Sequence, residues 1–277
     1  MSKVLLIGKD SETTRSIVQA LAESGCPAEC AHGGVDAMRR LRHQSFDVLI
    51  TNPETTIEED LALIEEVREV RPGVKTILLA PHTTPEEVIA ALRARAFVCI
   101  SAPFDASEIA SFAGRALSDA DWRTDIEVLS AQPHWVSLRA NCRMLTAERV
   151  ISFLRELCSE LPDDARDDVM MAFREILLNA MEHGAAFNRH KVVEVSAVRT
   201  ERTIVFYVRD PGAGFRRDAI AHAAVANAPD DPSAHIEHRD ELGMRPGGYG
   251  ILLAQGVVDE LIYSEAGNEV LLIKHTA

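Results

Sequence analysis

This sequence is poor in cysteine, and the cysteines it has form no recognisable pattern. Five occur in 277 residues, and no two of them are spaced as Cys-x-x-Cys: Cys26, Cys30, Cys99, Cys142 and Cys158. An odd, scattered set argues against a disulfide framework and against a structural zinc site, which needs paired ligands. We therefore expect reduced thiols in a cytoplasmic protein.

Clustered positive charge and long apolar runs are also missing. The formal net charge is −14, which argues against a nucleic-acid surface, because phosphate contacts there need clustered Lys and Arg. The negative net charge does not exclude binding of an anionic nucleotide, because backbone amides and a metal can hold phosphates in an acidic protein. No apolar run approaches the length of a membrane span. The apolar run within the first residues, MSKVLLIGKDSE, is too short for the apolar region of a secretory signal peptide. We expect neither a membrane nor a direct nucleic-acid partner.

The chain is long enough for two domains, and the first 118 residues alternate two periods. Continuous aliphatic runs, typical of strands buried on both faces of a parallel sheet, are separated by helical stretches, several of which begin with Ser, Thr or Asp. This alternation predicts a doubly wound α/β domain of five βα units over residues 1–118. The expected strands are 3–8, 28–32, 47–51, 75–80 and 97–101, and the expected helices are 11–25, 34–44, 58–70, 84–96 and 105–117.

The pattern breaks at residues 119–132, which we interpret as a linker, and a different order follows over 133–277. A strand at 134–142 precedes two helices, 146–160 and 163–183, and then two strands, 191–200 and 202–210. A polar segment without periodicity covers 215–247, and a helix at 250–261 and a hairpin at 262–275 complete the domain. This order predicts an α+β domain in two layers, with helices on a mixed sheet.

Three polar residues recur at every fourth position of the stretch EILLNAMEHG, residues 175–184. Residues four apart on a helix differ by only about 40° in direction, so Glu175, Asn179 and His183 share one stripe. The stripe borders an apolar face, where a ligand pocket would lie. For His183 a structural reading is equally good, because His in a last helical turn and Gly after it are common ends of helices.

Two glycine-containing motifs follow. In VRDPGAGF a strand continues into Asp210, Gly212 and Gly214, where an acid can accept a hydrogen bond from a ligand amine and the glycines permit close approach. In RPGGYGILLAQG, Gly248 and Gly250 open an apolar helix whose free amides could bind an anion. Each motif alone is weak, because turns are generally rich in Asp and Gly.

The order of the three motifs resembles the ATP-binding (Bergerat) domain of the GHKL superfamily, which includes gyrase-type ATPases, MutL, histidine kinases and anti-sigma-factor serine kinases. The resemblance covers residues 133–277. It implies that Asn179 coordinates Mg²⁺ bridging the ATP phosphates, that Asp210 binds the adenine amino group, and that 215–247 is the ATP lid. It also implies an ATP-binding role for the remaining motif residues, His183, Gly212, Gly214, Gly248 and Gly250. Phosphate contacts from Arg216, Arg217 and Arg245 are weaker expectations, because a solvated surface explains them as well.

Glu175 distinguishes between members of the superfamily. Transfer of a phosphoryl group to a hydroxyl benefits from a carboxylate that accepts the proton, so Glu175 is the expected catalytic base. Histidine kinases resemble this motif but typically carry Asn there, and they need a phosphoacceptor His on a preceding helical hairpin, whereas residues 119–150 contain only His134.

The domain therefore looks most like an anti-sigma-factor serine/threonine kinase, with a sigma factor or an anti-sigma antagonist as partner and often a homodimer. Two alternatives stay open. The first is a module that binds its partner in a nucleotide-dependent manner without turnover, and the second is a histidine-kinase-like ATPase module.

The five βα units resemble the flavodoxin-like receiver domain of response regulators. Receivers use acids after the first strand, a phosphorylated Asp after the third, a Thr or Ser after the fourth and Lys-Pro after the fifth. The matching positions here are Gly8, Lys9, Asn52, Ala80 and Ala102, although Asp10 and Pro103 are retained. The set lacks the nucleophile and the groups that screen its phosphate, so we expect a pseudo-receiver that serves as a docking or regulatory domain.

Overall fold

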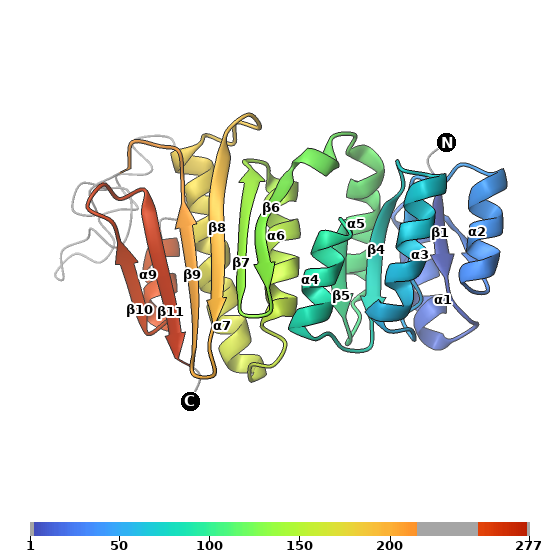
Figure 1. Cartoon of the computed structure of the whole chain (residues 1–277), viewed down its shortest axis with the longest axis horizontal. Helices are drawn as coiled ribbons and strands as arrows, with labels where there is room; N and C mark the ends of the chain where they lie inside the picture. The colour runs from blue at the N-terminus through green and yellow to red at the C-terminus, as the bar shows by residue number, and fades with distance from the viewer. Residues whose placement is uncertain (1–2, 215–248, 276–277) are drawn as a thin grey trace. The chain divides into compact units, whose positions relative to one another are not determined.

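The computed structural model describes residues 3–214 and 249–275 and divides into two compact units. Unit 1 contains Met1–Thr124 together with Ser152–Glu160, and unit 2 contains Asp125–Ile151 and Leu161–Ala277. Figure 1 labels the helices and strands of both units. In the described ranges no helix combines the length and the apolar character that crossing a membrane requires.

The sheet of unit 1 consists of five parallel strands in the order β2-β1-β3-β4-β5. The strands are β1 (Val4–Ile7), β2 (Ala28–Ala31), β3 (Val48–Ile50), β4 (Lys75–Ala80) and β5 (Val98–Ser101). Strands β1, β3 and β4 are buried over their whole length, as expected where helices cover both faces. The predicted doubly wound, flavodoxin-like fold is confirmed.

Five helices surround this sheet, and most begin at the expected N-caps. The helices are α1 (Glu12–Glu23), α2 (Gly34–His43), α3 (Ile57–Val70), α4 (Pro85–Arg93) and α5 (Ala106–Ser118). The side chains of Ser11, Thr56, Thr84 and Asp105 accept hydrogen bonds from backbone amides of the first turn. Such caps replace hydrogen bonds that the first helical amides cannot make within the helix.

Unit 1 also includes Ser152–Glu160, the end of helix α6 (Met144–Leu157) and the residues that follow it. The buried carboxylate of Glu156 accepts hydrogen bonds from the Thr83 hydroxyl group at 2.7 Å and the Ser101 amide at 3.0 Å. The Ser152 hydroxyl group donates to the Cys99 carbonyl oxygen at 3.0 Å, so this segment uses a backbone acceptor of the edge strand β5. Covering a sheet edge in this way removes a surface on which another chain could pair.

Unit 2 is built on six strands in the order β10-β11-β9-β8-β7-β6, and each neighbouring pair is antiparallel. The strands are β6 (Ile126–Gln132), β7 (Trp135–Asn141), β8 (Val192–Arg199), β9 (Thr203–Arg209), β10 (Glu260–Tyr263) and β11 (Glu269–His275). The expectation of a mixed sheet is therefore wrong. Short connections explain the antiparallel pairs β6–β7, β8–β9 and β10–β11, because a parallel pair requires a longer crossover. Strands β7 and β8 are antiparallel although helices α6 and α7 lie between them in the chain.

Helices α7 (Asp163–Asn179) and α9 (Gly250–Val257) pack against each other on one face of this sheet, and Figure 1 shows them behind the strands. The rings of Phe173 in α7 and Phe206 in β9 are 4.7 Å apart between centroids, and both side chains are buried. This ring pair fixes α7 on β9 two residues before Glu175 and four residues before Asp210. A two-layer α+β unit is thus confirmed.

The predicted linker, 119–132, is mostly regular structure. A short 3₁₀ helix, η1 (Trp122–Thr124), belongs to unit 1, and strand β6 pairs with β7 as the last strand of the second sheet. The sequence did not reveal β6 because its register shifts between Val128 and Ser130, which interrupts the alternation of apolar and polar residues, and Leu129 is exposed. All five cysteines are free thiols in the structure.

Asp60 of helix α3 is a buried carboxyl group inside unit 1. It is 5% exposed, and Thr55 Oγ1 donates a hydrogen bond to its Oδ2 at 3.0 Å. Burial raises the pKa of Asp60 to about 6, although hydrogen bonds from Thr51 and Thr55 oppose the shift. Its folded-state pKa exceeds the ordinary value, so its contribution to stability is fully present below pH about 4 and is lost as pH rises through about 6.

We predict that Asp60→Asn stabilises unit 1 at pH 7.5 relative to pH 4.5, by up to roughly 2 kcal/mol, because the substitution removes a buried charge that forms as pH rises. Urea unfolding of the full chain, followed by Trp122 fluorescence in a Trp135→Phe background, measures this difference. Glu66→Gln, on the exposed side of the same helix, is the matched control. Equal effects of Asp60→Asn at both pH values would contradict the analysis.

Candidate functional site

Glu175 and Asn179 lie one turn apart on α7 and are both half-buried. The side chain of Glu175 is 31% exposed, and its Oε1 lies 3.8 Å from Nη1 of Arg174, its neighbour in sequence. The predicted stripe therefore exists for these two residues, and it borders the buried face formed by Phe173, Ile176 and Leu177. A carboxylate and a carboxamide are thus held side by side at the boundary between core and solvent.

The first residue of α9 abuts this pair. A Cβ atom placed on Gly250 would lie 2.6 Å from Glu175 Oε2 and 3.7 Å from Asn179 Nδ2. A side chain at position 250 would therefore require the Glu175 carboxylate to move away from the start of α9. Tyr249, the N-cap residue, makes no side-chain cap hydrogen bond, so this helix start carries positive partial charge without a side-chain cap.

Helix α7 changes its geometry directly after Asn179. Residues Ala180–Gly184 form a π-helix, η2, in which each hydrogen bond closes a wider turn. His183 lies within this π turn and is exposed, whereas Glu175 and Asn179 are half-buried. Its ATP-binding role stays a prediction. A single π turn is often found at functional sites, and here it leads from Asn179 to Gly184.

Gly184 packs directly on the carboxyl group of Asp210, which follows strand β9. A Cβ atom on Gly184 would lie 2.2 Å from Asp210 Oδ1, and one on Gly212 would lie 2.7 Å from the same oxygen and 2.9 Å from the Gly184 carbonyl oxygen. The Gly212 amide donates a hydrogen bond of 2.7 Å to Asp210 Oδ1. The structure therefore brings together the end of the helical motif and the Asp-x-Gly motif.

The surroundings of Asp210 contain residues that the sequence patterns did not single out. Burial raises the pKa of Asp210, while the Gly212 amide and the positive charge of Lys191 oppose the rise. The buried thiol of Cys142 has a pKa raised to about 11 by burial, lowered by Lys191 and raised further by Asp210. It therefore stays a neutral thiol near the carboxylate. These residues lie on loops and strand ends far apart in sequence, and no local pattern marks them.

The backbone of Asp210 is held by the β10–β11 hairpin. Its amide donates to the Asn268 carbonyl oxygen at 3.0 Å, and a Cβ atom on Gly214 would lie 1.8 Å from the Ala266 carbonyl oxygen. Gly214 has φ +77°, a conformation that favours glycine. The expected lid residues 215–247, with Arg216, Arg217, Arg245 and also Gly248, lie outside the described residues.

The arrangement fits a nucleotide with a divalent cation. One half offers the half-buried carboxylate of Asp210 to a base amine. The other half offers a helix N-terminus to phosphates and the carboxamide oxygen of Asn179 to a hard cation. Among the residues that the structure describes, no cluster of three His, Cys, Asp or Glu side chains could hold a metal. Magnesium suits the site because it is commonly bound by one or two protein ligands together with substrate phosphates.

The carboxyl edge of the sheet in unit 1 carries few polar groups. Gly8 follows β1, and a Cβ atom there would lie 2.8 Å from Thr14 Oγ1. The Thr14 hydroxyl group lies 3.0 Å from that of Ser11, the N-cap of α1, so the space beside Gly8 is filled. The amide oxygen of Asn52 accepts a hydrogen bond from the Glu54 amide at 3.2 Å.

Two family models match the chain. Residues 4–113 match the response regulator receiver domain, and residues 138–274 match the histidine kinase-like ATPase domain. The chain therefore joins a receiver domain to a GHKL-type ATPase domain.

Known proteins are similar over limited parts. The DNA-binding transcriptional regulator NtrC of Escherichia coli K12 is 24% identical over 115 residues, 42% of this chain and 24% of that protein. The regulatory protein AtoC of the same organism is 23% identical over 145 residues, 51% of this chain and 32% of that protein. A response regulator structure from Thermotoga maritima matches with a TM-score of 0.38 and 22% identity, covering 43% of this chain and all of that one. The chain thus covers about a quarter to a third of the two curated relatives.

We predict that Gly184→Ala destabilises unit 2 by about 1–3 kcal/mol and weakens nucleotide binding, because the added methyl group collides with the Asp210 carboxyl group. Thermal unfolding and titration with a fluorescent ATP analogue measure the two effects.

Gly256→Ala, in helix α9, is the matched control. Nothing lies within 4 Å of a Cβ atom at that position, so this variant should gain up to about 1 kcal/mol and bind normally. Normal binding by Gly184→Ala would show that Gly184 does not set the position of Asp210.

Proposed function

We propose that this chain, a receiver domain joined to a histidine kinase-like ATPase domain, is an ATP- and Mg²⁺-dependent protein serine/threonine kinase of the anti-sigma type. The observation that supports this most is the placement of the Glu175 carboxylate beside the Asn179 carboxamide at the start of α9. A carboxylate there is suited to accept a proton from a hydroxyl substrate.

Each residue has a chemical role in this proposal. Asp210 accepts a hydrogen bond from the adenine amine, and Asn179 holds Mg²⁺, which when bound neutralises charge on the phosphates. Glu175 takes the proton of a serine hydroxyl as its oxygen bonds to the γ-phosphorus. The bond from that phosphorus to the bridging oxygen breaks, and ADP leaves with that oxygen.

The proposed protein partner is an antagonist that presents the serine, or a sigma factor that the chain sequesters. Sequestration without turnover is the second candidate, and it uses the same nucleotide site. A homodimer also stays a prediction.

A histidine kinase is less well supported. His134 is exposed in the turn between β6 and β7. The described segment before α6 is thus a β-hairpin rather than the helical hairpin that carries a phosphoacceptor histidine in the kinases resembled.

We further propose that the receiver domain acts without phosphorylation, as a docking or regulatory domain. Asn52 has no carboxylate to act as nucleophile, Ala80 and Ala102 have no polar side-chain atoms, and Thr14 fills the space that an acid at position 8 would need. The proposal depends on this combination, because one change alone would leave most of the chemistry in place.

Glu175→Gln should retain ATP affinity within about twofold and lower ATP turnover about 100-fold or more, because the amide keeps the shape but cannot accept the proton. Steady-state phosphate release and calorimetry on the full chain measure both quantities. Asp210→Asn is the contrasting variant and should lose binding. Turnover unchanged by Glu175→Gln would exclude Glu175 as the base. Unmeasurable turnover in the wild type, with ATP bound and partner present, would favour sequestration, and acid-labile phosphate on the partner would favour a histidine kinase.

The full chain should gain no phosphoryl group when incubated with acetyl phosphate and Mg²⁺, as read by intact mass. Asn52→Asp should also stay unmodified, because restoring the nucleophile does not restore the acid pair or the lysine. An aspartyl phosphate on unit 1 of either protein would overturn the proposed pseudo-receiver.

A further inference from the structure

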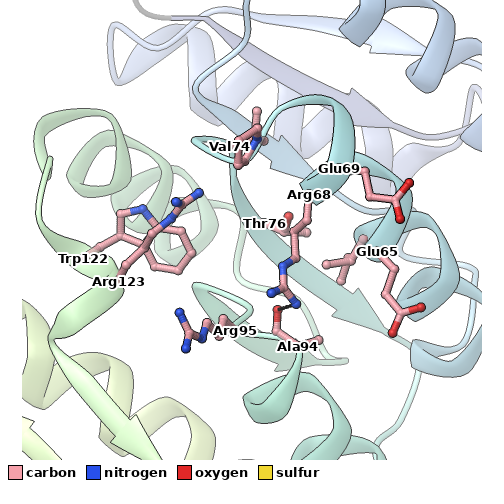
Figure 2. A pocket seen from close by; sticks show the side chains of 11 residues that line it. Glu65, Arg68, Glu69, Val74, Thr76, Ala94, Arg95, Trp122 and Arg123 are labelled. Carbon is pink, nitrogen blue, oxygen red and sulfur yellow. Dashed lines mark hydrogen bonds between the residues drawn. The ribbon is translucent and has the colours of Figure 1, made fainter.

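Unit 1 contains a cavity of about 440 Å³ at the edge of the sheet opposite to the carboxyl ends of its strands. Its walls come from the end of α3, the start of β4, the turn between α4 and β5, and η1 (Figure 2). The volume lies within the range of small-molecule sites. No role for this cavity follows from the nucleotide site or from the carboxyl edge of the sheet.

Three arginines surround the cavity: Arg68, Arg95 and Arg123. Glu65 and Glu69 also line the cavity, and Figure 2 shows their carboxylates pointing away from the three guanidinium groups. Within the described part of the chain, none of the three guanidinium groups forms an ion pair with a carboxylate. Three unneutralised cations around one cavity are unexpected in a chain of net charge −14.

The structural roles of these arginines leave most of their donors unused. Arg68 donates one hydrogen bond of 3.5 Å to the Ala94 carbonyl oxygen, the C-cap of α4. The Arg123 guanidinium lies 5.7 Å from the centroid of the Trp122 ring, which forms one wall and is 6% exposed. A guanidinium group has five N–H donors, so each can still bind an oxyanion in a bidentate manner.

Arg95 occupies a backbone position that favours glycine. Its φ is +56°, its amide donates to the Leu92 carbonyl oxygen, and the Ala96 amide donates to that of Ala91. This is the Schellman end of α4, where the left-handed residue is usually glycine. An arginine there costs about 1 kcal/mol relative to glycine.

We propose that this cavity binds a small ligand carrying a phosphate or carboxylate group, with Arg68, Arg95 and Arg123 as oxyanion donors and the Trp122 ring as an apolar wall. Trp122 and Arg123 belong to the last element of unit 1 before unit 2 begins at Asp125. A ligand in the cavity therefore contacts the segment through which the chain leaves the receiver domain.

The test uses the full chain in a Trp135→Phe background, so that Trp122 is the only tryptophan. Inorganic pyrophosphate and citrate are titrated separately at constant ionic strength, and Trp122 fluorescence and calorimetry follow binding. At least one probe should give a saturable change, and which one does so identifies the anionic group.

Arg95→Gly and Arg123→Gln should each weaken binding about tenfold or more, because a charged hydrogen bond contributes about 1.5–3 kcal/mol. Arg95→Gly should not lower the melting temperature, because glycine suits the left-handed position. Arg42→Gln, an exposed arginine of α2, is the matched control and should bind normally. The proposal is overturned if neither probe gives saturable binding. It is also overturned if Arg95→Gly and Arg123→Gln both bind the probe as tightly as the wild type does. Pyrophosphate bound in unit 2 would give that second result.

Discussion

The contact between Gly184 and the Asp210 carboxyl group is the constraint on which the candidate nucleotide site depends. It joins the end of the helical layer to the end of strand β9, two segments that are 26 positions apart in sequence. Because no side chain separates them, the π turn that begins after Asn179 ends against the acid that would bind the base. The same turn thereby sets the separation between the two halves of the site. Packing of Phe173 on Phe206 holds the layers together, and the glycines determine how closely they meet.

The nucleotide site in unit 2 and the arginine-lined cavity in unit 1 each show how an acidic protein can attract an anion locally. Positive potential comes from the start of α9 in unit 2 and from three guanidinium groups in unit 1, and both are short-range sources. Near Asp210, Lys191 supports the ionised carboxylate against the cost of burial. The net charge of the chain therefore helps to predict whether it binds nucleic acid, which contacts an extended surface. It does not predict whether a small anion binds, because the nearest dipoles and charged side chains determine the potential within a few ångströms.

Much of this could be predicted from the sequence, for identifiable reasons. The buried strands of unit 1 are continuous aliphatic runs, and their helices carry side-chain caps such as Thr56 and Thr84, so the doubly wound fold is encoded locally. Glu175 and Asn179 were found together because a regular helix repeats every four residues. The π turn after Asn179 has no signal in hydrophobic periodicity, so the helix geometry around His183 could not be predicted. Strand β6 pairs with β7 through a register shift between Val128 and Ser130, which interrupts the alternation typical of a strand. The positions of Cys142 and Lys191 near Asp210 depend on contacts distant in sequence.

Gly8 and Thr14 have a consequence for redesign of the receiver domain. The space that a larger residue needs at position 8 is taken by the Thr14 side chain, whose hydroxyl group lies 3.0 Å from that of Ser11, the N-cap of α1. A design that installs an acid after β1 must therefore change position 14 as well, so the two positions form one design unit.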